Sequence, residues 1–122
     1  MGEIRVRAAR GAIVVNGDTA ASVLSATERL LGAMLERNEI ASDDIVSAFF
    51  TVTDDLRSAF PAEAARRMGL GRVPLLCAQE IPVEGSMRGV IRVLLQFHTA
   101  LAPAAVAHVY LDGAETLRDD LG

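Results

Sequence analysis

Hydrophobic and polar residues alternate at the start of the chain, in a pattern that predicts a β-strand over residues 4–15. The alternation changes parity around residues 8–9, which leaves Arg10 undecided between the core face and the exposed face. We expect a bend or bulge there that would aim Arg10 at a neighbouring group. Beyond a turn at residues 16–19, apolar residues recur with the 3.6-residue period of an amphipathic helix, and Asn38 is expected to end that helix.

The rest of the pattern predicts one short helix and four more strands. The helix covers residues 62–68, with Pro61 suited to its first turn and Gly69 to its end. The tail is expected to be mobile over residues 113–122. The strands are expected at residues 45–53, 73–80, 90–99 and 107–111.

The strand at residues 90–99 separates its side chains most clearly. Alternate residues of a strand point to opposite faces, so one face of this strand is apolar and the other is mixed. We expect the apolar face to meet the helices and the mixed face to look into a polar or shared interior. The apolar face consists of Ile91, Val93, Leu95 and Phe97, and the mixed face of Arg92, Leu94, Gln96 and His98.

The predicted order of elements is β-α-β-α-β-β-β, which indicates an α/β (α+β) fold in a single domain over residues 1–122. Two helices can cover only one face of a mixed sheet. The opposite face therefore needs a partner, and we expect the chain to oligomerise. Sites between subunits are expected for the same reason.

Composition favours a soluble protein with an aliphatic core. The 122 residues are 51% hydrophobic and 4% aromatic, with a mean hydropathy of +0.30. No apolar run approaches the roughly 18 residues of a membrane span, and residues 1–5 lack the apolar core of a signal peptide. We expect a cytoplasmic protein without membrane contact. Because Cys77 is the single cysteine and His98 and His108 are the only histidines, neither an internal disulfide nor a structural metal is expected.

The charged residues argue against one class of partner. The formal net charge is −4, and all 12 basic residues are arginines. An acidic chain with dispersed arginines does not suit nucleic acid. Genome composition can explain the absence of lysine; the alternative is that arginine is needed to hold carboxylates with two parallel hydrogen bonds. The second explanation leaves a small anion as a candidate ligand.

Two charges interrupt the apolar runs between residues 73 and 97. Glu80 ends one predicted strand and Arg92 lies within the next. A charge in an apolar run is costly unless it is paired or useful, so the two residues form either a buried structural ion pair or part of a site. The sequence contains no nucleophile motif, no pair of histidines at metal spacing and no glycine-rich phosphate loop. The available groups suit a reaction that depends on positioning and charge stabilisation.

Five segments, taken in order, resemble the trimeric pseudo-α/β-barrel class of bacterial chorismate mutase. The resemblance runs from about residue 4 to residue 121 and includes the tail at residues 117–121. Each motif is weak alone, and their common order makes the match strong. The segments are Arg10-Gly11-Ala12, Phe60-Pro61-Ala62-Glu63-Ala64-Ala65-Arg66, Val73-Pro74-Leu75-Leu76-Cys77-Ala78-Gln79-Glu80, Val90-Ile91-Arg92-Val93 and His108-Val109-Tyr110-Leu111.

The resemblance implies a fold, an assembly and a reaction. It implies a homotrimer whose sheets line a shared barrel-like core with the helices outside, and three active sites in clefts between adjacent subunits. The implied substrate is chorismate, which undergoes an intramolecular Claisen rearrangement to prephenate on the route to phenylalanine and tyrosine. The family needs no cofactor, and none is expected here.

The resemblance also implies roles for residues of one subunit. Arg92 matches the cation beside the ether oxygen, and Glu80 matches the carboxylate that accepts a hydrogen bond from the ring hydroxyl. Arg10 matches an arginine that binds a substrate carboxylate. Tyr110 matches a phenol that orients the side-chain carboxylate and enol ether, although its ring could instead simply close the barrel. Cys77 matches a position that lines the pocket, and it also suits a small apolar filler.

The neighbouring subunit is expected to supply Phe60, Ala62 and Arg66 as the wall and second cationic edge of the cleft. Arg118 belongs to a tail that can fold over the entrance as a partial lid. Two positions depart from other family members. Some members carry lysine at Glu63, which should point away from the substrate or pair with Arg66, and Leu76 stands where others have a small polar residue.

Two other functions are compatible with a small trimeric protein of this kind. One is a non-catalytic trimer that binds a metabolite of the aromatic pathway in the same cleft. The other is an enamine or imine deaminase, which belongs to another trimeric α/β family with arginine-lined clefts. We find none of the deaminase motifs in this sequence.

Overall fold

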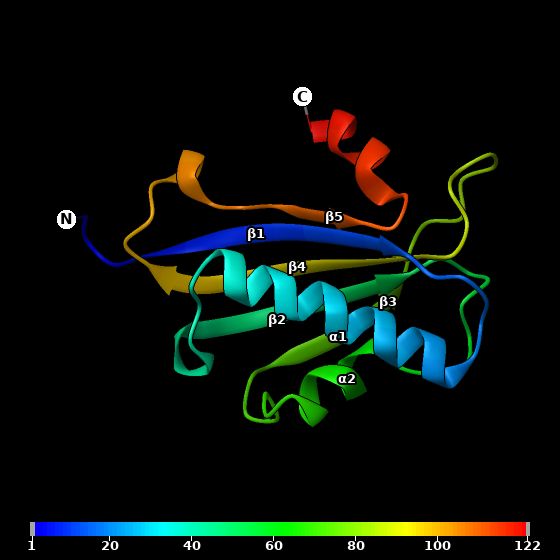
Figure 1. Ribbon diagram of the computed structural model, residues 1–122, viewed down its shortest axis with the longest axis horizontal. Helices are drawn as coiled ribbons and strands as arrows, with labels where there is room; N and C mark the ends of the chain where they lie inside the picture. The colour runs from blue at the N-terminus through cyan, green and yellow to red at the C-terminus, as the bar shows by residue number, and fades with distance from the viewer. Residues whose placement is uncertain (1, 122) are drawn as a thin grey trace.

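The computed structural model describes residues 2–121, except for the side chains of residues 118–121. It contains the predicted order of two helices and five strands (Figure 1). The principal elements are β1 (Arg5–Val14), α1 (Ala20–Arg37), β2 (Ile45–Val52), α2 (Pro61–Arg67), β3 (Leu75–Gln79), β4 (Val90–Thr99) and β5 (Val109–Leu111). Three short 3₁₀ helices connect or follow them: η1 (Ser42–Asp44), η2 (Pro103–Ala105) and η3 (Ala114–Leu121).

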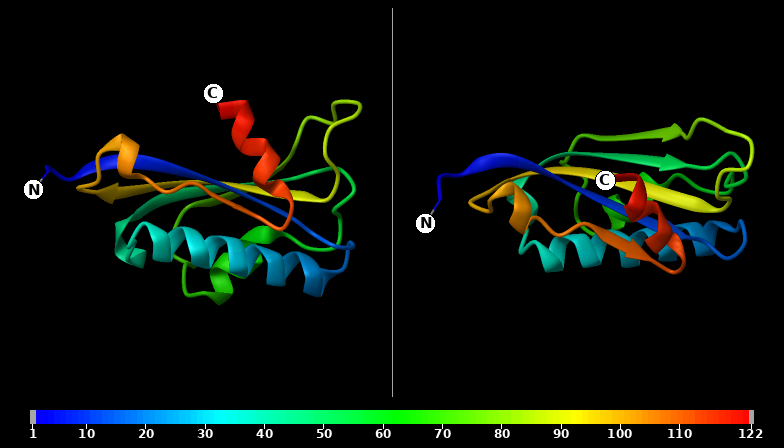
Figure 2. Two further views of the ribbon diagram at one scale, coloured as in Figure 1. Left: turned by 45° about the horizontal axis from the view of Figure 1, so that its top comes forward. Right: turned by 90° about the horizontal axis from the view of Figure 1, so that it is seen from above.

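The strands form one mixed sheet in the order β3-β2-β4-β1-β5. β4 is antiparallel to both β1 and β2, whereas β3 and β5 are the edge strands and run parallel to their neighbours. Both helices lie against the same face of the sheet (Figures 1 and 2). We call the other face the open face. The mixed sheet with helices on one face confirms the predicted fold class. None of the helices in the described part of the chain is long and apolar enough to cross a membrane.

The core lies between the sheet and α1, and β4 supplies its centre. Ile91, Leu95 and Phe97 are completely buried, whereas Leu94, on the open face, is 37% exposed. This division confirms the alternation predicted for β4. Burial of each large apolar side chain stabilises the fold by roughly 1.5 to 3 kcal/mol. α1 contributes the facing side chains Val23, Leu24, Leu30, Leu31 and Met34.

The bulge expected near residues 8–9 was a wrong prediction. β1 pairs with β4 without a register shift, and Arg10 lies opposite Leu94 on the open face. The irregularity is in β2 instead, between Ile45 and Ser47. The pattern of β1 gave a wrong prediction because both faces of the strand are covered near its C-terminal end. Ala12, on the open face, is buried there in a small cluster with η3.

The tail forms an element that the sequence pattern did not predict. Ala114 and Leu117 of η3 are buried against β1 and the start of β4. Asp112, at φ 54°, turns the chain from β5 into η3, and its carboxylate accepts hydrogen bonds from both terminal nitrogens of Arg29 on α1. The hydrogen bond from Arg29 holds the pKa of Asp112 below its ordinary value. Arg29 therefore fixes the point from which η3 begins. Whether residues 113–122 are mobile stays a prediction.

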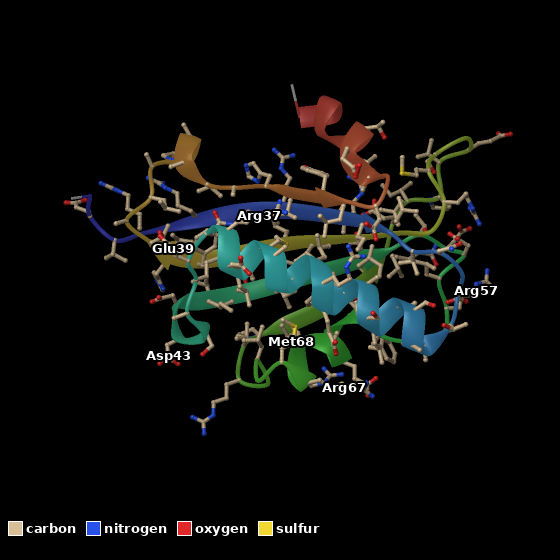
Figure 3. The ribbon with its side chains drawn as sticks, viewed as in Figure 1. Arg37, Glu39, Asp43, Arg57, Arg67 and Met68 are labelled. Carbon is tan, nitrogen blue, oxygen red and sulfur yellow. The ribbon has the colours of Figure 1, made fainter. Side chains whose placement is uncertain are left out.

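Asn38 ends α1 as predicted and also ties the helix to the segment before β5. It is the C-cap residue of α1, and its neighbours in sequence, Arg37 and Glu39, are labelled at this end of the helix in Figure 3. Its amide nitrogen donates to the carbonyls of Met34 and Ala107, both at 2.9 Å, and its amide oxygen accepts from the backbone N–H of Ala107 at 2.7 Å. The side chain is 3% exposed and fully hydrogen-bonded.

We expect Asn38→Ala to lower the free energy of unfolding by about 2 to 4 kcal/mol, because it leaves both backbone groups of Ala107 without their partners. Urea denaturation at a fixed protein concentration measures the change. Asn16→Ala is the control: Asn16 is exposed, so its replacement should alter stability by less than about 0.5 kcal/mol. Equal effects of the two substitutions would contradict the assigned role of Asn38.

Candidate functional site

Four of the predicted site residues lie around one hollow on the open face. Arg10 comes from β1, Arg92 from β4, Tyr110 from β5 and Glu80 from the residue after β3. Ala12 pairs with Arg92 on one side and with Tyr110 on the other, so its small side chain separates the two larger ones. The hollow has a volume of about 280 Å³. We call it the open-face hollow; its other lining residues are Gly11, Ala12, Phe49, Thr51, Val93 and Leu94.

Glu80 is held in this hollow by the backbone and by a threonine. Its backbone N–H donates to the carbonyl of Val52 at 2.8 Å, which continues the pairing of β3 with β2 by one residue. The hydroxyl of Thr51 donates to Oε2 of Glu80. Thr51 also lies directly opposite Arg92 in the pairing of β2 with β4. The sequence analysis missed Thr51. The available signal was its position two residues after Phe49 in β2, which places both side chains on the open face.

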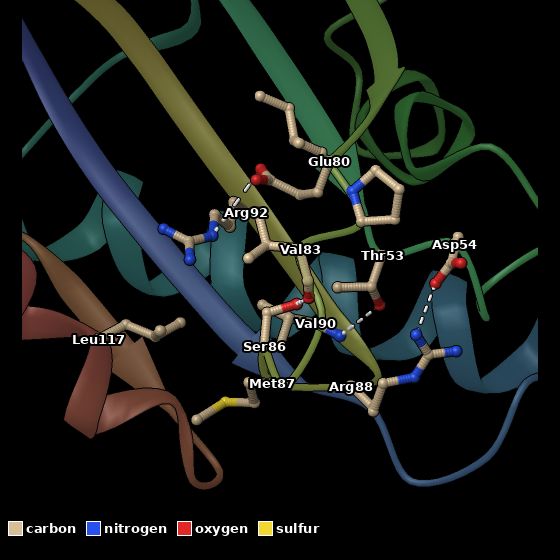
Figure 4. A pocket seen from close by; sticks show the side chains of 12 residues that line it. Thr53, Asp54, Glu80, Val83, Ser86, Met87, Arg88, Val90, Arg92 and Leu117 are labelled. Atoms are coloured by element: carbon tan, nitrogen blue, oxygen red, sulfur yellow. Dashed lines mark hydrogen bonds and ion pairs between the residues drawn. The ribbon is translucent and has the colours of Figure 1, made fainter.

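Glu80 and Arg92 approach each other without forming a buried ion pair. Nε of Arg92 is 3.8 Å from Oε2 of Glu80, the same oxygen that accepts from Thr51 (Figure 4). The side chain of Glu80 is 31% exposed and that of Arg92 is 41% exposed. A partly exposed pair at this distance contributes little to stability, about 0 to 1 kcal/mol at most. Arg92 approaches Glu80 through Nε, and no described side chain pairs with its two terminal nitrogens, which can therefore face a ligand.

A second hollow adjoins the first, because Glu80 and Arg92 line both (Figure 4). It has a volume of about 490 Å³ and lies beneath the connection between β3 and β4. Leu117 of η3 reaches its edge. Together the two hollows are in the size range of small-molecule sites, roughly 300 to 1,000 Å³.

Two aspartates hold the connection between β3 and β4. Asp54 pairs with Arg88 at 2.7 Å, and Oδ1 of Asp55 accepts from the backbone N–H of Gly89 at 3.2 Å. The hydrogen bond with Thr53, assisted by the one from Gly89, holds the pKa of Asp55 below its ordinary value despite partial burial. These contacts fix the end of the connection from which β4 enters the site.

Three other predicted site residues line a hollow on the helix side of the sheet. Phe60, Arg66 and Cys77 lie around a volume of about 570 Å³ between the N-terminal end of α2 and the edge strand β3. We call it the helix-side hollow. Phe60, at the residue before α2, is 71% exposed. Glu63, which also lines this hollow, pairs with Arg67 at 3.8 Å and not with Arg66. Among the described side chains, Arg66 therefore has no ion-pair partner.

Two predicted site residues lie outside these hollows, and the side chain of a third is not described. Ala62 is buried in the core between α2 and the sheet and lines none of the three hollows. Leu76 is on the open face, 57% exposed, and outside the described hollows. The side chain of Arg118 lies outside the described residues. The structure thus brings together Arg10, Glu80, Arg92 and Tyr110, and the sheet separates them from the helix-side hollow.

The two groups have complementary chemistry. The open-face hollow holds two guanidinium groups, one carboxylate and one phenol, which suits an anionic ligand with a hydroxyl group. The helix-side hollow offers an aromatic ring and a further guanidinium group. In the described part of the chain, no three histidine, cysteine or acidic side chains lie close enough to hold a metal ion.

Known proteins share this chain's sequence and structure over nearly its whole length. The family model described as chorismate mutase type I matches residues 6–121. Chorismate mutase AroH of Thermus thermophilus is 53% identical over 117 residues, covering 95% of this chain and 96% of that protein. AroH of Bacillus subtilis is 37% identical, again over 95% of this chain, and covers 92% of its own length.

A solved structure agrees with these relatives. A chorismate mutase from Clostridium thermocellum superimposes with a TM-score of 0.89 and 44% sequence identity, over 90% of this chain and 98% of the other. Sequence and fold therefore point to the same family that the five ordered motifs indicated. The chain belongs to the chorismate mutase type I family.

Proposed function

We propose that this chorismate mutase rearranges chorismate to prephenate in a cleft that a second subunit completes. The observation that carries the proposal is the division of the cationic residues between two sides of the sheet. Arg10 and Arg92 lie on the open face, whereas Arg66 lies on the helix side near the edge strand β3. Neither group alone surrounds a ligand. Two copies, placed with the open-face hollow of one against the helix-side hollow of the next, would surround it.

The open face supports a cyclic homotrimer. Beside the charged residues it exposes apolar side chains that the described residues leave accessible: Val6, Phe49, Leu76 and Leu94. Burying such a surface favours association. A head-to-tail interface that closes into a ring of three would repeat the same cleft three times. The same proposal includes a cytoplasmic location, with phenylalanine and tyrosine as the pathway's products.

Charge complementarity assigns the residues to the substrate. Chorismate carries two carboxylates. We assign one carboxylate to Arg10, with Tyr110 orienting it. Arg66 of the neighbouring subunit would form the second cationic edge of the cleft. Arginine binds carboxylates through two parallel hydrogen bonds. Phe60 of the neighbouring subunit, with the backbone beside Ala62, would form the apolar wall. Glu80, held by Thr51, would accept the hydrogen bond of the ring hydroxyl.

Arg92 would supply the main electrostatic contribution to catalysis. The rearrangement breaks the ether C–O bond while a C–C bond forms within the same molecule, and no proton is transferred. The ether oxygen gains negative charge as its bond stretches, and the terminal nitrogens of Arg92 can stabilise it. Enzymes at the low end of rate enhancement need about 8 kcal/mol of transition-state stabilisation. One preorganised donor contributes roughly 3 to 4 kcal/mol, and holding the substrate in its compact reactive conformer supplies much of the rest.

The proposed activity is tested by the loss of chorismate absorbance and the appearance of phenylpyruvate after acid treatment, with purified protein of known assembly state. Prephenate formation supports the proposal. A pure trimer that binds a dianionic analogue without turnover would favour the non-catalytic alternative. Membership of the chorismate mutase family excludes the deaminase alternative.

We expect Arg92→Gln to lower kcat by several hundredfold with a much smaller change in KM, because the interaction strengthens as the ether bond breaks. The kcat of Arg92→Lys should lie between those of the wild type and Arg92→Gln, because lysine keeps the charge but loses the planar guanidinium group. Steady-state kinetics gives both constants. Arg5→Gln is the control, because Arg5 is exposed and pairs with Glu3. A change confined to KM would show that Arg92 only binds substrate.

Thr51→Val should lower kcat/KM by about tenfold to a hundredfold, because it removes a hydrogen bond to a carboxylate while keeping the branched shape of the side chain. The matched control is Ser47→Ala, in the same strand, which loses a hydrogen bond to Gln96 and leaves Glu80 untouched. If the two variants have equal activity, Thr51 does not position Glu80.

Mixed trimers test the shared cleft. When Arg92→Gln and Arg66→Gln chains are refolded together, each mixed trimer should regain about one intact site in three, because the two losses fall on different subunits of that site. Activity should then exceed that of either variant alone. Refolding Arg92→Gln with Arg10→Gln is the control and should recover nothing, since both residues belong to the same half. Equal behaviour of the two mixtures would mean that the site lies within one chain.

A further inference from the structure

We infer that Asp18 is a positioning residue that holds the wall formed by Phe60 and Arg66 at the distance the shared cleft requires. The inference rests on the proposed function and extends it to a residue that contacts neither hollow. Asp18 belongs to the turn between β1 and α1, far in sequence from the wall that it supports.

Asp18 holds the loop before α2 through three hydrogen bonds, and we call this contact the clamp. Its Oδ1 accepts from the backbone N–H groups of Arg57 and Ser58, each at 3.1 Å. In return, the hydroxyl of Ser58 donates to the backbone carbonyl of Asp18 at 3.0 Å. Arg57 lies beside the beginning of α1 (Figure 3). A carboxylate that accepts two backbone N–H groups forms stronger hydrogen bonds than a neutral acceptor would.

The backbone on both sides of Asp18 is well fixed. It follows Gly17, whose φ of 94° makes the turn, and precedes Thr19, whose side chain caps the N-terminus of α1 by accepting from Ser22. The 18-residue helix and the end of β1 therefore fix the backbone of Asp18 from both sides. Burial alone would raise the pKa of Asp18, and the hydrogen bonds from Arg57 and Ser58 lower it below its ordinary value.

The clamped loop leads directly into the wall. Ser58 lies two residues before Phe60, which is the N-cap of α2, and Arg66 is in the last turn of that short helix. Arg57, Ser58, Phe60 and Arg66 all line the helix-side hollow. Phe60 is exposed, whereas α2 is anchored by its buried residues Pro61, Ala62, Ala64 and Ala65. The clamp therefore acts on the loop that carries the aromatic ring and leads into the helix that carries the guanidinium group.

The division of the cleft predicts which kinetic constant responds. The wall contacts parts of the substrate that do not change charge in the reaction, whereas Arg92 on the other subunit faces the breaking bond. Loss of the clamp should weaken binding of substrate and transition state equally. We expect Asp18→Ala to raise KM about tenfold and to change kcat by less than about threefold.

The experiment compares four variants with the wild-type trimer, with assembly checked by light scattering. Asp18→Ala removes the acceptor, and Asp18→Asn keeps a neutral oxygen that can accept the same two hydrogen bonds. Arg66→Gln and the double variant Asp18→Ala/Arg66→Gln form a double-mutant cycle. Asp43→Ala is the control, because Asp43 is an exposed aspartate in η1, away from the hollows.

The expected result is a raised KM for Asp18→Ala, a KM close to wild type for Asp18→Asn, and little further effect of Asp18→Ala once Arg66 is already replaced. An unchanged KM, or the same fold-change with and without Arg66, would overturn the inference, because a purely structural residue acts independently of Arg66. If Asp18→Ala does not assemble, Ser58→Ala, which removes one bond of the clamp, takes its place in the cycle with an expected rise of about twofold to threefold. Failure of the wild-type protein to convert chorismate would instead overturn the proposed function.

Discussion

Two helices cover one face of a five-stranded sheet, whereas the described residues cover the other face only in part, where η3 packs on Ala12. Every strand that crosses the sheet must therefore present some side chains to a surface that is neither core nor ordinary exterior. Apolar side chains such as Phe49 and Leu94 occupy part of this face, and charged ones such as Arg10 and Arg92 occupy the rest. The combination suits an interface that also contains a site.

Strand periodicity then places the charges. Arg92 lies between Ile91 and Val93, both of which are buried against the helices, so its own side chain must point to the open face. The pairing of β1 with β4 carries Arg10 to the same face, and the parallel pairing of β5 brings Tyr110 beside Ala12. The groups that we propose to act on the substrate are thus fixed by the sheet itself, which is more rigid than a loop. The residues proposed to come from a neighbour lie instead on a loop and a short helix, where clamps such as that of Asp18 are needed.

Much of this could be predicted from the sequence, because the period of β4 and the capping residues of the helices are local signals. The faces of β1 could not be predicted, because Ala12 is buried by η3, a tail element about 100 residues further along the chain whose packing no local pattern reveals. The ion pair of Glu63 with Arg67 in place of Arg66 depends on rotamers that the shared helical face does not decide. Thr51 was missed because a threonine in a strand is ordinary until its neighbours across two strand pairings are known.

The central claim is that one substrate touches residues on both sides of the sheet, supplied by two subunits. A crystal structure of the protein with a bicyclic dianionic mimic of the transition state tests it most directly. We expect Arg92 and Glu80 of one subunit and Phe60 and Arg66 of the neighbouring subunit to contact the same ligand, with Arg92 at the ether-oxygen position. A ligand held by residues of one chain alone, or an Arg92 that contacts only Glu80, would contradict it.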